Sequence, residues 1–152
     1  MTSFFNLGYR EYVFERNYSM TRRELSENVF MMLFRVEFHG EEEMPEQLVL
    51  FQEELENLKE KDSEYINHKC NEIFAKLPEL DEAINEKATG WKTTRMAKVD
   101  LSIIRLAVYE MKYEDGIDAK VSINEAVELA KKFDMPDSSS FVNGVLAGVV
   151  NK

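Results

Sequence analysis

Cysteine and histidine are scarce in this chain of 152 residues, which contains one cysteine, Cys70, and two histidines, His39 and His68. A lone cysteine cannot form a disulfide within the chain, which is typical of a protein from a reducing compartment. Three candidate ligands are too few for a typical structural zinc site. His68 and Cys70 are two residues apart, a spacing that points side chains in different directions on a helix. We therefore expect no metal and no cofactor.

The chain also lacks the features of membrane spans, secretion signals and phosphate-binding loops. No stretch approaches the roughly 18 consecutive apolar residues of a membrane span. Residues 1–19 lack a basic segment followed by an unbroken apolar core, as a secretion signal would have. The six glycines are dispersed, which argues against a glycine-rich phosphate loop. The sequence predicts a cytoplasmic protein that does not enter a membrane.

Basic residues are outnumbered, since 29 acidic residues against 19 lysines and arginines give a formal net charge of −10. This balance argues against a general binder of polyanions, because affinity for phosphate backbones comes mainly from clustered lysine and arginine. The acidic residues are concentrated between Gly40 and Asp62, a stretch with nine acids and two lysines. The rest of the chain carries only a small negative charge, so a local basic patch elsewhere is compatible with the composition.

The most apolar part of the sequence is the stretch from Arg95 to Met111, RMAKVDLSIIRLAVYEM. Its apolar residues occupy nearly all sides of a helix, which is typical of a helix enclosed by neighbours. We therefore expect the central helix of an all-helical domain, capped by Thr93 or Thr94. The charged residues inside it must reach water or find partners, because an unpaired buried charge is costly. We expect Arg105 to pair with a carboxylate of a packed neighbour.

Apolar residues at spacings of three and four predict further helices on both sides of this one. Capping boxes, in which two side chains satisfy each other's backbone amides, are predicted at Thr21–Glu24 and Ser122–Glu125. Gly144, Ala147 and Gly148 form a small-residue face where another helix can approach closely. No strand is persuasive, and the expected fold is all-α with seven helices, over 22–38, 45–59, from 63, a short one from 78, 95–111, 122–133, and from 139 or 140 to 150.

Enzyme motifs are weak, because neither histidine neighbours the serines at 138–140 and the glutamates of 41–56 fit a solvated acidic face better than a carboxylate site. The segment 122–150 superficially resembles a helix-turn-helix, but its last helix has few side chains suited to bases and phosphates. The other candidate is the start of the first helix, where Arg22 and Arg23 lie beside backbone amides that attract phosphate. From these two residues alone, solvated charges are the simpler explanation.

Four blocks of the sequence resemble the NusB family of transcription antitermination factors in order and spacing. The blocks are RRELSENVFMMLFRVE, VDLSIIRLAVYEM, KVSINEAVELAKKF and DSSSFVNGVL, and the resemblance runs from Met20 to the C-terminus. It implies two perpendicular three-helix subdomains around a central helix, and a role without enzymatic activity. It also implies that the protein pairs with the ribosomal protein NusE. The pair would bind boxA RNA of ribosomal transcripts and, with other Nus factors, help RNA polymerase to resist termination.

The resemblance also implies which residues bind. Arg22 and Arg23 match the family's arginine-rich RNA-binding motif, but Ser26 stands where that motif has a further arginine. Phe34 stands where a tyrosine is usual, and it is assigned to RNA as well. Unaided RNA affinity is therefore expected to be weak, with the partner supplying much of the basic surface. Further matched positions are Phe141 and Asn143, placed near RNA or the partner and assigned to RNA, and Phe133, Asp137 and Ser138, assigned to the NusE interface.

Residues 1–19 lie outside the resemblance and hold six aromatic residues without a clear period. They are either a native extension that packs its aromatics on the domain or an added upstream segment, with Met20 as the natural start. We expect the second, which leaves residues 20–152 as the RNA-binding domain. A native extension folded over the first helix could cover its arginines and compete with RNA.

Two other functions stay open at the level of sequence. One is a protein–protein adapter of the same fold whose RNA contacts have decayed, suggested by Ser26 and the acidic balance. The other is the NusB-like module attached to some RNA methyltransferases, although no catalytic domain follows Lys152. Some members of the family self-associate, so a homodimer is a further expectation.

Overall fold

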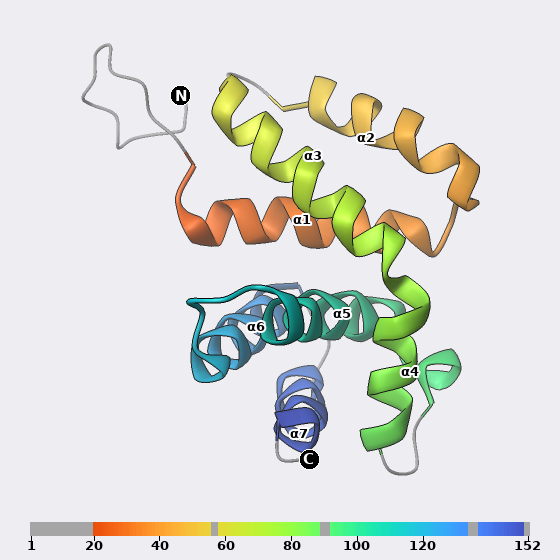
Figure 1. Cartoon of the computed structure of the whole chain (residues 1–152), viewed down its shortest axis with the longest axis vertical. Coiled ribbons are helices and arrows are strands. Elements are labelled where there is room, and N and C mark those ends of the chain that lie inside the picture. The colour runs from red at the N-terminus through yellow and green to blue at the C-terminus, as the bar shows by residue number, and fades with distance from the viewer. Residues whose placement is uncertain (1–19, 56–57, 89–91, 134–136, 151–152) are drawn as a thin grey trace.

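The computed structural model describes residues 20–55, 58–88, 92–133 and 137–150 (Figure 1). The described residues contain seven α-helices, two short 3-10 helices and no strand, so the predicted all-α class is confirmed. The N-terminal segment 1–19 lies outside them. In chain order the elements are α1 (Arg22–Val36), η1 (Glu41–Glu43), α2 (Met44–Glu53), α3 (Glu60–Ala75), α4 (Leu77–Lys87), η2 (Thr93–Arg95), α5 (Lys98–Tyr113), α6 (Ala119–Phe133) and α7 (Ser138–Val150).

The predicted central helix is confirmed as α5. Every residue from Asp100 to Glu110 is buried, and α4, α6 and α7 pack around this helix (Figure 1). The first three helices form a second group, in which α1 contacts α2, α3 and also α5. The buried apolar residues of both groups make one continuous core. α1 therefore joins the two groups, and its position relative to α5 and α6 decides where its own surface residues lie.

The start of α1 follows the predicted capping box. Thr21 Oγ1 accepts the Glu24 amide at 3.1 Å, and Glu24 Oε1 accepts the Thr21 amide at 2.9 Å. Each of these bonds satisfies a backbone donor that the helix itself cannot pair, and a cap of this kind is worth about 1 kcal/mol. The first turn of α1, which carries both arginines of the sequence motif, is therefore well defined.

The predicted start of the central helix is wrong by three residues. Thr93–Arg95 form the 3-10 helix η2, and α5 begins only at Lys98. The Thr93 amide donates to Asn85 Oδ1 at 2.7 Å, and Ala97 at the N-cap of α5 provides no side-chain cap. The two threonines therefore end the connection from α4 rather than cap α5.

The boundaries of α2, α3 and α7 also differ from the prediction. α2 ends at Glu53, six residues before the predicted end, and α3 starts at Glu60. Leu55 and Leu58, whose spacing suggested a longer helix, still pack against the core from the segment that follows α2. α7 begins at Ser138, one residue early. Apolar spacing thus marks which side chains are covered, but it does not show where the backbone leaves the helix.

The capping box predicted at Ser122–Glu125 is wrong. α6 begins at Ala119, and the Ser122 amide already donates to the Asp118 carbonyl at 3.2 Å, as a residue inside a helix does. The Ser122 hydroxyl is buried and donates instead to Glu110 Oε1 of α5 at 2.9 Å. The Ser122 side chain therefore joins α6 to α5 rather than capping the start of α6.

The small-residue face of α7 meets another helix at one of its glycines. A Cβ added to Gly148 would lie 3.4 Å from the Lys87 carbonyl at the end of α4, whereas a Cβ on Gly144 would meet nothing within 4 Å. The close approach predicted for this face is therefore present at Gly148 and absent at Gly144. Among the described residues, Gly144 faces open space.

Cys70 of α3 is fully buried, and burial raises the pKa of its thiol from 9.0 to about 12. Only the thiolate reacts with thiol reagents, so we expect the native protein to resist a disulfide reagent at neutral pH. Full reactivity should appear on unfolding in urea, and stopped-flow absorbance in the two states would measure the difference. Rapid modification of the native protein, at the rate of the unfolded chain, would contradict this placement.

Candidate nucleic-acid interface

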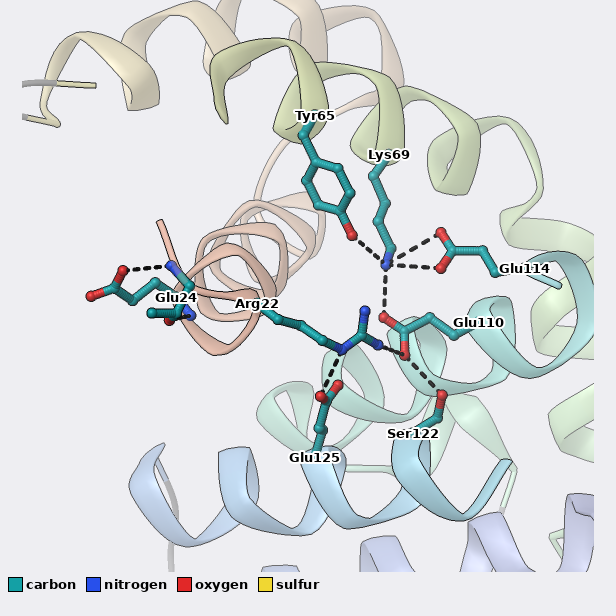
Figure 2. A network of polar contacts seen from close by, with 9 residues as sticks. Arg22, Glu24, Tyr65, Lys69, Glu110, Glu114, Ser122 and Glu125 are labelled. Atoms are coloured by element: carbon teal, nitrogen blue, oxygen red, sulfur yellow. Dashed lines mark hydrogen bonds and ion pairs between the residues drawn. The ribbon is translucent and has the colours of Figure 1, made fainter. Parts of the chain in front are cut away.

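A polar network lies where α1, α3, α5 and α6 meet (Figure 2). Lys69 Nζ of α3 is 2.7 Å from Glu110 Oε2 of α5, 3.0 Å from the Tyr65 hydroxyl and 3.3 Å from Glu114. The side chains of Lys69 and Glu110 are each only 3% exposed. Burial acts to lower the pKa of Lys69, but the adjacent Glu110 carboxylate outweighs it and raises that pKa above its usual value. Lys69 is therefore a buried cation. It is the partner of Glu110, one of the charged residues inside the apolar central helix.

Arg22 reaches the same network from the first turn of α1. Its Nε donates to Glu125 Oε2 of α6 at 2.7 Å, and its Nη2 lies 3.6 Å from Glu110 Oε1 (Figure 2). The hydrogen bond to Glu125 raises the pKa of Arg22 above its ordinary value. The side chain is 40% exposed, but its donors point at carboxylates of the protein itself. Arg22 thus ties α1 to α5 and α6.

Arg23 takes a different direction and lines a groove of about 250 Å³ between α1 and α6. Arg23 is exposed, and among the described residues it forms no ion pair with a carboxylate. Ser26, at the position where the family motif has an arginine, is small and nearly buried in the same groove. The opposite wall carries Lys131 and Lys132 of α6. The groove therefore presents three cations from two helices.

The cations of α6 are paired with carboxylates that are themselves in the groove. Lys132 Nζ is 2.9 Å from Glu27 Oε2, and Lys131 Nζ is 3.7 Å from Glu128 Oε2. Both lysine side chains are more than half exposed, and ion pairs of this kind contribute about 0–1 kcal/mol. A phosphate can therefore replace Glu128 as the partner of Lys131 at small cost. Glu27 is only 16% exposed, so replacing it as the partner of Lys132 costs more.

Phe34 belongs to a row of aromatic rings that continues from the groove. Phe30, Phe34 and Phe38 are spaced four residues apart on α1 and in the turn after it, with ring centroids separated by 6.3 and 5.2 Å. Phe133 of α6 lies 5.1 Å from Phe30, and the neighbouring Lys132 Nζ is 5.5 Å from the Phe133 ring. Exposure increases along the row, from buried Phe30 through partly buried Phe34 to Phe38 at 61%. The aromatic row thus begins beside Lys132 and Phe133 of α6 and ends at the exposed ring of Phe38.

The remaining predicted residues lie at the end of α6 and the start of α7. Asp137 is exposed with a positive φ of 79°, and its carbonyl accepts the Phe141 amide at 3.1 Å, the first bond of α7. Ser138 is buried, Phe141 packs partly against the core, and Asn143 is exposed. The structure brings Phe133 together with the aromatic row of α1, at 5.1 Å from Phe30.

Sequence reasoning missed Lys69, Glu125 and the lysine pair of α6. Lys131 and Lys132 follow the apolar pattern of α6 and look like ordinary solvated charges at a helix end. Their one signal is position, because Phe133, which the resemblance assigns to binding, follows them directly. Lys69 gives no local signal, since its burial depends on how α3 packs against α5.

The described residues contain no group of three or more histidine, cysteine or acidic side chains arranged to hold a metal ion. His39 Nδ1 lies 2.9 Å from Glu43 Oε1, so one of the two histidines has a partner at the surface. Within the same residues, no helix combines the length and the apolar character needed to cross a membrane.

Comparison with known proteins matches residues 22–151 to the NusB family model. The transcription antitermination protein NusB of Agathobacter rectalis is 61% identical over 128 residues, which cover 84% of this chain and 98% of that protein. The structure of T. maritima NusB superposes with a TM-score of 0.78 at 31% identity, covering 89% of this chain and 94% of that one. A chain from a crystal structure of NusB and NusE with dsRNA has the same fold, with a TM-score of 0.70 at 23% identity, covering 86% and 96%. The protein belongs to the NusB family of transcription antitermination proteins, which are not enzymes.

Proposed function

We propose that the protein binds boxA RNA of ribosomal transcripts together with the ribosomal protein NusE, in the cytoplasm, and supports processive elongation by RNA polymerase with other Nus factors. The observation that carries this proposal is the surface shared by α1 and α6. There an exposed arginine and two lysines meet in one groove, and a row of aromatic rings leads away from it. Cations that hold the backbone and rings on which bases stack are the usual means of binding single-stranded RNA.

NusE is the partner because a protein of the same fold has been solved as a complex of NusB and NusE with dsRNA. We assign its contact to the start of α7, where the exposed Asp137 directly precedes the helix with a positive φ of 79°. Phe133 is the last residue of α6, and Ser138 is the first of α7. Ser138 is buried, so its side chain offers the partner little surface.

The net charge of the chain affects how much of the RNA affinity comes from this protein and how much from NusE. With a formal net charge of −10 and Ser26 in place of a motif arginine, this chain alone attracts a polyanion weakly. A basic partner adjacent to the groove would reduce this repulsion. We therefore expect strong RNA binding only by the pair.

Fluorescence anisotropy of a labelled boxA-type RNA tests the proposal with this protein alone, NusE alone and the mixture. The mixture should bind more tightly than either component. Arg23→Ala should weaken RNA binding by the mixture about tenfold, equivalent to about 1.4 kcal/mol, because it removes one phosphate contact. Arg95→Ala, at an arginine of η2 outside the groove, is the matched control and should leave RNA affinity nearly unchanged.

A separate titration of NusE without RNA distinguishes the alternative function. Arg23→Ala should leave NusE affinity unchanged, whereas Asp137→Ala should reduce it. NusE binding with no gain in RNA affinity would contradict the RNA-binding role and support the adapter whose RNA contacts have decayed.

A further inference from the structure

The two arginines of the motif differ in what their side chains face. Arg22 is directed at Glu125 and Glu110, at 2.7 and 3.6 Å, whereas Arg23 forms no ion pair among the described residues and lines the open groove. Successive residues of an α-helix are about 100° apart around its axis, so adjacent side chains can face different neighbours. The sequence motif presents them as a pair, but the fold separates them.

The contacts of Arg22 lie next to the groove and join three helices. Arg22 starts α1, Glu125 belongs to α6, and Glu110 belongs to α5 (Figure 2). Glu110 is in turn held by Lys69 at 2.7 Å and by the Ser122 hydroxyl at 2.9 Å, so the carboxylate that Arg22 approaches has a fixed position. Glu125 also lines the groove. Arg22 therefore holds the first turn of α1 against α6 beside Arg23, while the Glu27–Lys132 and Phe30–Phe133 contacts join the two helices further along α1.

We propose that Arg22 is a positioning residue that fixes α1 against α6, and that RNA phosphates are held in the α1–α6 groove by Arg23, Lys131 and Lys132. This inference rests on the proposed RNA-binding function. It assigns to α6 a share of RNA binding that the arginine motif of α1 does not contain. It also explains how a chain with Ser26 in its motif keeps three cations around one groove, since the small serine leaves room there and the lysines come from the facing helix.

The salt dependence of RNA binding separates a phosphate contact from a positioning residue. Each phosphate contact on a single strand adds about 0.7 to the slope of log affinity against log salt concentration. With labelled boxA-type RNA and NusE present, Arg23→Ala and Lys132→Ala should each reduce the magnitude of that slope by about 0.7. Arg22→Ala should weaken binding about threefold to tenfold at every salt concentration with the slope unchanged. A slope reduced by Arg22→Ala as much as by Arg23→Ala would overturn the inference, as would an unchanged slope for Lys132→Ala.

Two neutral variants of α6 provide a matched comparison. Glu125→Gln and Glu128→Gln each remove one negative charge from the same groove, but only the first replaces the carboxylate that pairs with the Arg22 guanidinium by a neutral amide. If Arg22 positions α1, Glu125→Gln should bind RNA more weakly than Glu128→Gln, which should bind as tightly as wild type or slightly more tightly. If Arg22 instead contacts phosphate, freeing it by Glu125→Gln would tighten binding, and the inference would be wrong.

The same data distinguish this inference from the proposed function. Wild-type protein that gains no RNA affinity with NusE would contradict the proposed function and the inference with it. Wild-type binding with a normal salt slope but a different pattern among the variants would contradict only the inference. Thermal melts by circular dichroism accompany each variant, and the nearly isosteric Glu125→Gln carries the comparison if Arg22→Ala does not fold.

Discussion

Replacing Lys69 with methionine is expected to lower the free energy of unfolding by about 3–5 kcal/mol. Methionine fills a similar volume, so the loss comes from the charge of Glu110, which would stay buried without its 2.7 Å partner. Arg22, at 3.6 Å from the other oxygen, compensates in part and places the expected loss toward the lower end. Urea unfolding followed by circular dichroism measures this loss.

Two further variants show whether the buried charge is the cause. Lys131→Met makes the same change at an exposed lysine whose carboxylate is 3.7 Å away, and it should alter stability by less than about 0.5 kcal/mol. The double variant Lys69→Met/Glu110→Gln removes the buried charge of Glu110, leaves only the partly exposed Glu114 without Lys69, and keeps an acceptor for Ser122, so it should be more stable than Lys69→Met alone. A double variant with the summed loss of both single changes would contradict the explanation.

The pH dependence of this effect follows from the direction of the pKa shift. The pKa of Lys69 is raised in the folded protein, so its contribution is fully present below the unfolded pKa of about 10.5 and is lost only as pH rises through the higher folded value. The cost of Lys69→Met should therefore be constant between about pH 6 and pH 9. Stability that already falls within this range would point to a different titrating group.

The sequence predicted those parts of the fold that depend on local pattern. α5 was recognisable because apolar residues surround it, and the start of α1 because Thr21 and Glu24 have the spacing of a capping box. The same spacing at Ser122 and Glu125 gave a wrong prediction, because the Ser122 hydroxyl donates to the buried carboxylate of Glu110 on α5 instead. A local motif lists the bonds a residue can make, and tertiary packing selects among them.

In the candidate site, too, the local sequence did not determine which partners the side chains have. The resemblance pointed to the start of α1, but the different orientations of Arg22 and Arg23 depend on Glu125, which is distant in sequence. Lys132 joins the groove only because α6 crosses beside α1 and brings it within 2.9 Å of Glu27. Contacts between residues about 100 positions apart leave no periodicity for a single sequence to show. The resemblance indicated which residues of α1 belong to the site, whereas the partners of these residues became visible only in the folded structure.

Arg105 provides the second large expected effect, at the opposite end of α1. Its Nε and Nη2 donate to the two oxygens of Asp81 at 2.9 and 2.7 Å, and its Nη1 donates to Glu37 Oε2 at 2.7 Å. The predicted carboxylate partner on a neighbouring helix is thus Asp81 of α4, while Glu37 is the C-cap of α1. The Arg105 side chain is 9% exposed. Among the described residues Asp81 forms an ion pair with Arg105 alone, whereas Glu37 also has Lys98 Nζ at 3.2 Å from its Oε1.

Arg105→Met should lower the free energy of unfolding by about 2–4 kcal/mol, less than a fully buried pair would lose because Asp81 and Glu37 keep some access to water. Arg105→Lys should recover only part of the loss, since an ammonium cannot donate the paired bonds that a guanidinium gives to one carboxylate. Urea unfolding of both variants measures the difference, and equal stability of wild type and Arg105→Lys would show that charge alone suffices.

The two arginines that anchor α1 to α5 should act independently. α1 has 15 residues, so at about 1.5 Å per residue its Arg22 end and its Glu37 end are about 22 Å apart. Changes separated by more than about 7–10 Å without shared partners usually add within about 0.5 kcal/mol. Arg22→Ala/Arg105→Met should therefore lose the sum of the two single losses in urea unfolding. In the RNA titration, Arg22→Ala should weaken binding far more than Arg105→Met, because only the Arg22 end of α1 borders the groove.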